Sequence, residues 1–198
     1  LMRGKAVNGK RLLEMHNVSK RFGEHEVLHN IDLEVFSGEI CCILGKNGAG
    51  KSTLMKMLMG VYKRDAGDIR ISGVSVDIPS PAVAERLGIK MIFQEPELIP
   101  ELTVAENIFL NKQPRHRYTR LIDYGRMYFE AGEALHNFGI DLDPAAVVKD
   151  LKYSEWQLVS IVKVCADKSA KLIIMDEPTV SLQKDEVDTL FAIIRSLA

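Results

Sequence analysis

The stretch "GKNGAGKST" at residues 45–53 constrains the fold of this chain more than any other feature. It matches the template G-x-x-x-x-G-K-[ST], in which a glycine-rich turn wraps round a polyphosphate and directs its backbone N–H groups inward. The helix predicted over 51–59 would aim the positive end of its dipole at the same anion. The alternative is an ordinary glycine-rich turn before a helix, but four specified positions arise by chance in only about one in a hundred such chains. We therefore expect a nucleotide-binding P-loop.

The residues of this loop have separate expected roles. Lys51 would supply a point charge for the outer phosphates, and the Ser52 hydroxyl is placed to ligate Mg²⁺. We therefore expect ATP and Mg²⁺ as cofactors. The remaining residues expected to surround the nucleotide are Gly45, Asn47, Gly48, Ala49, Gly50 and Thr53.

The segment that leads into the loop, "ICCILG", is apolar at alternate and intervening positions alike. Such a run predicts a strand buried on both faces, as in a parallel sheet covered by helices, and the neighbouring Cys41 and Cys42 suit a buried strand in a reduced compartment. The following helix should bury Leu54, Met57 and Leu58. Strand, glycine loop and helix together indicate an α/β P-loop NTPase, with a mostly parallel sheet flanked by helices.

Other periodic segments complete the expected architecture. Strands are predicted over 12–19 and 27–35 and within "GDIRISGVSVD", as a small antiparallel portion, and a buried strand is predicted at "IKMIF". "SPAVAERLG" reads as a capped helix. Between Leu102 and Leu158 helices dominate, at 104–110, 124–138 and 144–149, separated by the basic loop "NKQPRHRYTR". In the last helix Val187, Leu190, Phe191 and Ile194 share one face.

Two strand ends carry further candidate residues. The apolar strand in "LIIMDEP" delivers Asp176 and Glu177 to its carboxyl end, where α/β sheets bind ligands. Asp176 would hold the Mg²⁺ shell through a water, and Glu177 would orient the attacking water or accept its proton, unless the pair is only an acidic cap. Gln94 could reach Mg²⁺ and the water through its amide. Phe22 could stack on an adenine ring or simply pack.

The bulk composition excludes several classes of function. With 26 basic and 27 acidic residues, the net charge of −1 gives no global attraction to nucleic acid. Three cysteines and scattered histidines argue against a metal site of their own. No run of eighteen apolar residues exists, and the polar opening at residues 1–11 has no apolar signal region, so neither a membrane span nor a secretory signal is expected. We expect that opening to be a loose tail.

Together these motifs resemble the ATP-binding subunit of an ABC transporter, from about Leu13 to the last residue. The resemblance is carried by "KRFG" for the aromatic loop, "GKNGAGKST" for Walker A, "IFQE" for the Q-loop and "LIIMDEPT" for Walker B. The stretches "SPAVAERLGIKMIFQEPELIPELTVAENIFL" and "VDTLFAIIRSL" are similar to the first cassette of the monosaccharide importer ATPases, which carry two fused cassettes. The resemblance implies a nucleotide-binding domain over 12–198, with a helical subdomain at about 103–160.

The family signature, Leu-Ser-Gly-Gly-Gln, corresponds here to "YSEWQ" at 153–157. The resemblance implies that Ser154 and Gln157, at the start of a helix, meet the γ-phosphate held by a second cassette. Glu155 and Trp156 replace the two glycines. Like charges about 4 Å apart repel by roughly 4 kcal/mol at an effective dielectric of 20, so Glu155 could weaken that site. Alternatively, both side chains turn away, with Trp156 packed among helices and Glu155 favouring the helix N-terminus.

Two further departures concern the later motifs. Gln183 stands where many cassettes have aspartate, although the sugar group commonly does not. The chain ends before the strand and histidine that normally contact the γ-phosphate, so the sequence assigns that role to no residue, and truncation of the domain is the simplest explanation.

The resemblance implies a subunit that binds and hydrolyses ATP to drive import, with a monosaccharide as cargo and Lys51, Gln94 and Glu177 acting in catalysis. Its partners would be a second cassette, membrane permease subunits and, indirectly, a solute-binding protein, on the cytoplasmic face of the membrane and without nucleic acid. The alternative is a regulatory nucleotide-binding cassette whose altered signature supports little hydrolysis. A soluble ABC ATPase of translation or DNA repair fits less well, because strongly basic insertions are lacking.

Overall fold

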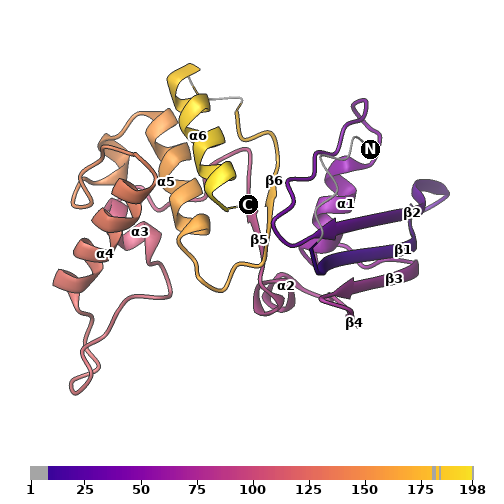
Figure 1. Cartoon of the computed structure of the whole chain (residues 1–198), viewed down its shortest axis with the longest axis horizontal. Coiled ribbons are helices and arrows are strands. Elements are labelled where there is room, and N and C mark those ends of the chain that lie inside the picture. The colour runs from indigo at the N-terminus through magenta and orange to yellow at the C-terminus, as the bar shows by residue number, and fades with distance from the viewer. Residues whose placement is uncertain (1–8, 180–181, 183, 198) are drawn as a thin grey trace. The chain divides into compact units, whose positions relative to one another are not determined.

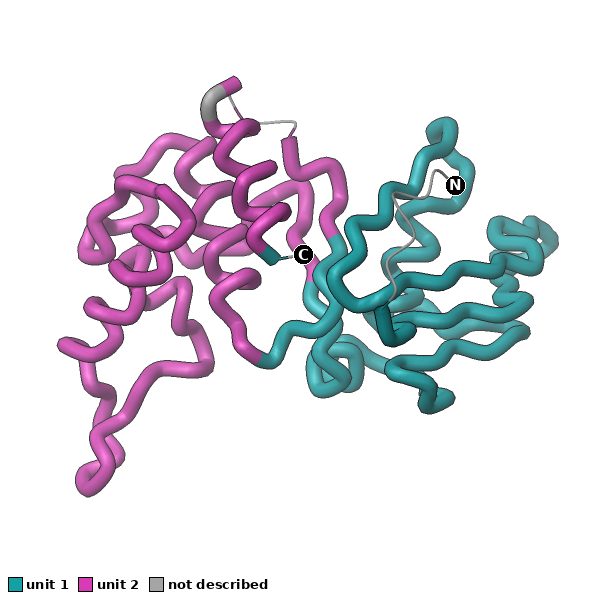
Figure 2. Tube along the Cα trace, viewed as in Figure 1, with its two compact units in different colours: residues 1–90, 169–174, 197–198 teal, residues 91–168, 175–196 magenta. Residues whose placement is uncertain are grey.

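The computed structural model of the protein describes residues 9–179, 182 and 184–197 (Figure 1). The chain divides into two compact units, coloured separately in Figure 2. Within the described residues, unit 1 holds 9–90, 169–174 and 197, and unit 2 holds 91–168 and the described part of 175–196.

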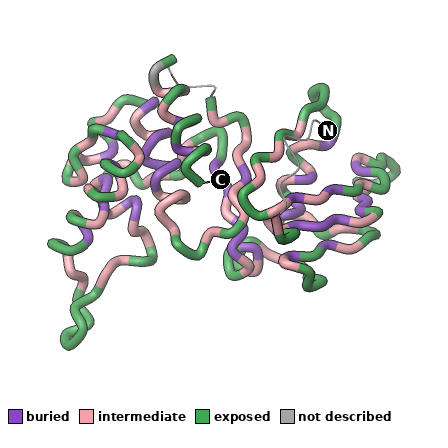
Figure 3. The backbone as a smooth tube through the Cα atoms, in the orientation of Figure 1, coloured by how far each residue is buried: buried purple, intermediate pink, exposed green. Residues whose placement is uncertain are grey.

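Unit 1 is built on an antiparallel sheet of four strands in the order β2-β1-β3-β4. β1 (Arg11–Phe22) and β2 (His25–Phe36) form a long hairpin, and β3 (Ala66–Ile71) pairs with β1 and with the short β4 (Val74–Ser75). Leu13, Met15 and Ile69 are almost fully buried, and Glu14 between the first two is buried as well, so burial along β1 does not simply alternate; Figure 3 colours the sheet by burial. The predicted strands and the antiparallel portion are therefore confirmed, with both hairpin strands longer than expected.

Helix α1 (Lys51–Leu58) follows the glycine loop in the same unit. Its buried residues are Leu54, Met57 and Leu58, the three that the helical spacing predicts. Helix α2 (Pro81–Leu87) is also present, with Pro81 in its first turn and Gly88 in the left-handed region after its last turn. Ser80 does not cap it through its side chain, so that part of the expectation is wrong.

The segment 40–45 before the loop differs from the prediction. It forms no named strand, and within it only Cys42 takes part in a bridge. Ile40 and Leu44 are 51% and 62% exposed, Cys42 is exposed and Cys41 is half-buried. Burial on both faces needs a cover on each side, whereas here alternate side chains face solvent. An apolar run alone therefore does not fix two-sided burial.

Unit 2 is mainly helical. Its helices are α3 (Val104–Ile108), α4 (Tyr124–Asn137), α5 (Tyr153–Cys165) and α6 (Lys184–Leu197), with α3 packed against both α4 and α5. The predicted helix at 144–149 is only a 3₁₀ turn, η1 (Val148–Asp150). The residues before it pair with the start of α3 instead, since Val104 N–H donates to the Ala146 carbonyl at 2.9 Å. On α6 Leu190 is buried but Phe191 is 46% exposed, contrary to the expected face.

Strands β5 (Ile89–Ile92) and β6 (Leu172–Met175) form a separate two-stranded sheet. Leu172 N–H donates to the Gly88 carbonyl at one end and Asp176 N–H to the Ile92 carbonyl at the other, so the strands run parallel. β5 is deeply buried as predicted, whereas only Ile174 is buried in β6.

The pairing of β3 with β1 depends on Gly67, and two glycine substitutions test this. Gly67 and Gly73 both have left-handed φ values, +89° and +82°, but a Cβ on Gly67 would lie 2.5 Å from the Asn17 carbonyl oxygen, whereas Gly73 faces open space. We expect Gly73→Ala to lower the free energy of unfolding by about 1–2 kcal/mol and Gly67→Ala by about 1–3 kcal/mol more. Urea unfolding measures both, and equal losses would contradict the packing described.

Candidate functional site

The glycine loop of unit 1 is shaped by two residues with left-handed backbone. The Ala49 N–H donates to the Lys46 carbonyl at 3.1 Å, which closes a four-residue turn with Gly48 at φ +81° in its third position. Gly50, at φ +87°, then starts α1. A Cβ on Gly50 would lie 2.7 Å from a Leu28 methyl carbon, and one on Gly45 would lie 3.3 Å from the Ala49 Cβ. The backbone path therefore depends on glycine at these positions.

The start of α1 leaves its backbone donors without acceptors. Leu54 N–H donates to the Gly50 carbonyl at 2.9 Å, the first bond of the helix. The N–H groups of Lys51, Ser52 and Thr53 donate to no acceptor among the described residues, and Gly50 has no side chain to cap them. These donors and the helix dipole together favour an anion at this end of α1.

The Lys51 ammonium group lies over its own loop. Its Nζ donates to the carbonyl oxygens of Gly45 at 2.7 Å and of Lys46 at 3.1 Å. These bonds hold a positive charge where the loop and the helix terminus also favour an anion. The residues present therefore fit a bound polyphosphate.

Phe22 lies at the end of β1 in the same unit as the loop. Its ring meets the ring of Tyr62 edge to face, with centroids 5.0 Å apart, and the Lys20 Nζ lies 5.4 Å from its centroid. Lys20 is held in turn by Asp65 at 2.9 Å. The backbone N–H of Arg21 and the Lys20 ammonium keep the pKa of Asp65 below its usual value. Phe22 stays 40% exposed, so stacking on a base remains a prediction that this geometry permits.

Gln94, Asp176 and Glu177 all belong to unit 2 and follow the parallel strands β5 and β6. Asp176 N–H donates to the Ile92 carbonyl at 3.1 Å, which places Asp176 and Gln94 at the carboxyl ends of adjacent strands. Glu177 is exposed and has a φ of +46°, a conformation that costs a residue other than glycine about 1–2 kcal/mol. Such strain is often concentrated at functional sites.

The segment that follows Gln94 is anchored by buried polar groups. Asn107, fully buried on α3, accepts the Ile99 N–H at 2.7 Å and donates to the carbonyls of Ile99 and Thr103 at 3.0 Å each. Lys163 of α5 donates to the Glu97 carbonyl at 3.1 Å, and burial lowers the pKa of that lysine. This segment is therefore tied to the two helices that surround it.

Comparison with known proteins identifies the family. Residues 28–180, most of the chain, match the family described as ABC transporter. This chain belongs to that family. The match spans the glycine loop, Gln94 and the acidic pair at 176 and 177. In this family the glycine loop at 45–53 is called Walker A, the segment at Gln94 is called the Q-loop, and the strand that ends at Asp176 and Glu177 is called Walker B.

Several relatives are ribose import ATP-binding proteins. The chain is 47% identical over 186 residues to one from Rubrobacter xylanophilus and 42% identical over 186 residues to one from Geobacillus kaustophilus. In both cases the alignment covers 94% of this chain, and the chain spans 37% of the relative's length.

Solved structures of ABC cassettes share the fold. An ATP-binding cassette of an ABC transporter in its ADP conformation superposes with a TM-score of 0.77 at 24% identity, covering 94% of this chain and 76% of that one. A dimeric cassette in a post-hydrolysis state, bound to ADP and phosphate, gives 0.76 at 24% identity, covering 94% and 82%. The α/β ABC cassette fold is therefore confirmed.

The signature segment of this ABC cassette forms the start of α5, as predicted. The Glu155 carboxylate accepts the backbone N–H of Lys152 at 2.7 Å, so it folds back on its own helix. A lysine at the capping position has no acceptor of its own, and only this half of a capping box forms. Trp156 is half-buried. Of the two alternatives for Glu155, the geometry favours the one in which it stabilises the helix N-terminus.

The polar residues retained in the signature are buried in unit 2. Ser154 is 9% exposed and Gln157 is fully buried, and neither Nε2 nor Oε1 of Gln157 has a partner among the described residues. An unpaired buried amide costs stability. Their contact with a nucleotide held by another cassette stays a prediction. Gln183 of the next motif lies outside the described residues.

The structure places the predicted residues in two units. Unit 1 holds Phe22 and the whole Walker A loop, and unit 2 holds Gln94, Asp176, Glu177 and the signature residues. Within unit 2, the bond from the Asp176 N–H to the Ile92 carbonyl places Gln94 and Asp176 at adjacent strand ends. Sequence reasoning did not anticipate Asn107 or Lys163, which anchor the segment after Gln94. The sequence signal for Asn107 was its position four residues after Thr103, which is the N-cap residue of the short helix α3.

Proposed function

We propose that this chain is the ATP-binding and hydrolysing part of an ABC importer whose cargo is a monosaccharide. The observation that carries the proposal is the Walker A loop, where the free N–H groups at the start of α1 and the Lys51 ammonium lie at a turn whose backbone path requires glycine. The importer assignment is supported by the relatives named for ribose import. Because this chain spans 37% of the length of those relatives, the activity of the whole transporter is part of the proposal.

In this proposal the loop backbone and Lys51 bind the β- and γ-phosphates, and Lys51 exchanges the carbonyls of Gly45 and Lys46 for phosphate oxygens. Ser52, Gln94 and Asp176 are the residues that would hold Mg²⁺, the last through a water. Mg²⁺, when bound, neutralises charge on the phosphate oxygens. The Glu177 carboxylate orients the attacking water and accepts its proton.

The proposed partners are a second cassette, membrane permease subunits and, through them, a solute-binding protein. In the proposal the helical part at about 103–160 docks on the permease, and the chain acts on the cytoplasmic face of the membrane. In the part of the chain that the structure describes, no helix is long and apolar enough to cross a bilayer.

Substitution of Glu177 tests the catalytic part. In the assembled transporter, Glu177→Gln should still bind MgATP but lower hydrolysis by at least about a hundredfold, because the amide cannot accept the proton. Glu101→Gln, at another exposed glutamate, should hydrolyse like the wild type. Hydrolysis is followed as phosphate release with bound nucleotide counted in parallel. Unchanged hydrolysis by Glu177→Gln would count against the assignment.

A second candidate is a regulatory cassette whose own signature supports little hydrolysis at the opposing site. It is favoured by the burial of Ser154 and Gln157 and by the two lost glycines. In this case the negative charge of Glu155 or the bulk of Trp156 hinders approach of a γ-phosphate.

Two variants separate the candidates. Glu155→Gln keeps an oxygen acceptor for the Lys152 N–H but removes the charge, so we expect nearly unchanged stability and, for the regulatory cassette, raised hydrolysis. Replacing Glu155 and Trp156 by glycine should raise hydrolysis further, at the cost of about 0.5–2 kcal/mol of stability through the lost cap. If phosphate release by the assembled transporter does not rise in either variant, the regulatory candidate is removed.

A further inference from the structure

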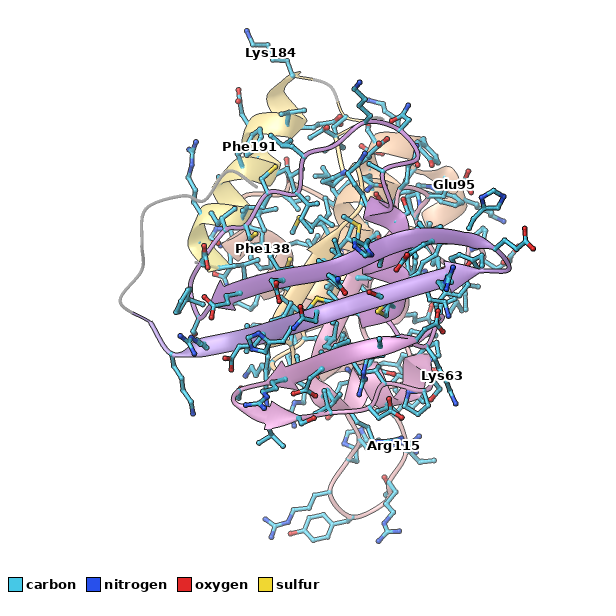
Figure 4. The ribbon with its side chains drawn as sticks, turned by 90° about the vertical axis from the view of Figure 1, so that its right-hand side faces the viewer. Lys63, Glu95, Arg115, Phe138, Lys184 and Phe191 are labelled. Atoms are coloured by element: carbon cyan, nitrogen blue, oxygen red, sulfur yellow. The ribbon has the colours of Figure 1, made fainter. Side chains whose placement is uncertain are left out.

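A hairpin in unit 2, residues 111–123, joins α3 to α4 and has no role in nucleotide binding or hydrolysis in the proposed function, although it lies within the helical part proposed to dock on the permease. His116 N–H donates to the Leu121 carbonyl at 2.9 Å, and Arg120 N–H donates to the His116 carbonyl at 3.0 Å. Further down the stem, Arg115 bridges Ile122 and Asp123 N–H donates to the Pro114 carbonyl at 2.8 Å. In Figures 1 and 4 the hairpin extends away from α4 as a narrow loop, with Arg115 labelled on its stem.

The hairpin is strongly cationic. Residues 111–123 contain Lys112, three arginines and one acidic residue, Asp123, whose carboxylate lies 3.3 Å from His116 Nδ1. Lys112 pairs with Asp167, and Arg115 donates to the Arg120 carbonyl at 2.9 Å. The side chains of Arg117 and Arg120 are exposed and have no partner among the described residues. Two unpaired positive charges therefore lie at the tip.

Apolar side chains lie beside these charges. Tyr118 is 91% exposed and Leu121 is 67% exposed, and Tyr124 follows at 50%. Isolated exposed apolar residues are common on protein surfaces, but here two of them alternate with two unpaired arginines within five residues. Tyrosine with its apolar ring and polar hydroxyl, next to arginine, is the combination found where proteins meet the interface of a bilayer.

The backbone conformation at the tip of the hairpin is unusual for the residue found there, Arg120. Arg120 has a φ of +60°, which costs an L-residue about 1–2 kcal/mol that glycine would avoid. Turns of this kind usually use glycine, asparagine, aspartate or proline, yet the tip reads "RYTR". An arginine in this strained position motivates a role for its side chain, because the backbone conformation alone would favour glycine.

We propose that this tip, formed by Arg117, Tyr118, Arg120 and Leu121, docks on a membrane surface that carries anionic lipid headgroups. The two guanidinium groups complement the headgroup phosphates, and the tyrosine and leucine side chains enter the interfacial layer. Four residues are too few for a stable protein interface, which buries about 800 Å² per partner. A lipid surface needs no fixed geometry, because each side chain adds its contribution separately. The inference goes beyond the transport function and requires no nucleotide.

Sedimentation with vesicles tests the proposal on the 198-residue chain without nucleotide. The chain should bind phosphatidylcholine vesicles containing about one third phosphatidylglycerol, and binding should weaken as salt rises. Each arginine near an anionic surface contributes about fivefold, so Arg117→Gln with Arg120→Gln should lower binding about 25-fold. Tyr118→Ala should lower binding by the same factor at every salt concentration, because it removes an uncharged side chain and leaves the salt-dependent contribution of the arginines unchanged.

Matched controls separate this site from general charge and from misfolding. Lys63→Gln with Arg86→Gln removes two exposed cations of unit 1, and its binding should equal that of the wild type (Figure 4 labels Lys63). Arg120→Gly relieves the backbone strain and removes one charge. That variant should be more stable in urea unfolding yet bind about fivefold more weakly, so a loss of binding cannot come from misfolding.

Four outcomes would overturn the proposal. They are equal binding to vesicles of phosphatidylcholine alone, no loss on replacing Arg117 and Arg120, an equal loss in the control variant, and binding to soluble polyglutamate in place of vesicles. The last outcome would identify an acidic protein segment as the partner.

Discussion

The site depends on the left-handed backbone at Gly48 and Gly50, which turns the chain into α1 without a side-chain cap. Because that turn leaves the first N–H groups of the helix without acceptors, the end of α1 favours an anion. Lys51 donates to two carbonyls of the same turn. Its positive charge is therefore held at the loop whose helix N–H groups also favour an anion. A Cβ at Gly50 would meet Leu28 of β2, which links the loop to the packing of the antiparallel sheet.

The altered signature takes on a local meaning once its contacts are known. Glu155 stabilises the first turn of α5 by accepting the Lys152 N–H, a task that the family's glycines cannot perform. The same helix carries Lys163, which donates to the Glu97 carbonyl in the segment after Gln94. The signature helix and the Q-loop segment are therefore joined within unit 2, whatever the strength of nucleotide contact at the opposing site.

Sequence alone predicted the features that depend on local rules. The P-loop template, the three buried residues of α1 and the two strands of the hairpin follow from spacing, and the structure agrees, although burial along β1 does not follow a strict period of two. The predictions of two-sided burial at 40–45 and of a helix at 144–149 were wrong, because both depend on neighbours that the sequence does not reveal. The left-handed φ of Glu177 and Arg120 likewise has no local signal, since neither residue type favours that conformation.

We propose that the loop at 45–53 and Lys51 bind the phosphates of ATP, and calorimetric titration of the chain with MgATP measures this binding. We expect saturable binding by the wild type and at least about tenfold weaker binding by Lys51→Ala, because hydrogen bonds to a charged group contribute about 1.5–3 kcal/mol each. Equal affinity in the two proteins, or no binding by the folded wild type, would contradict it.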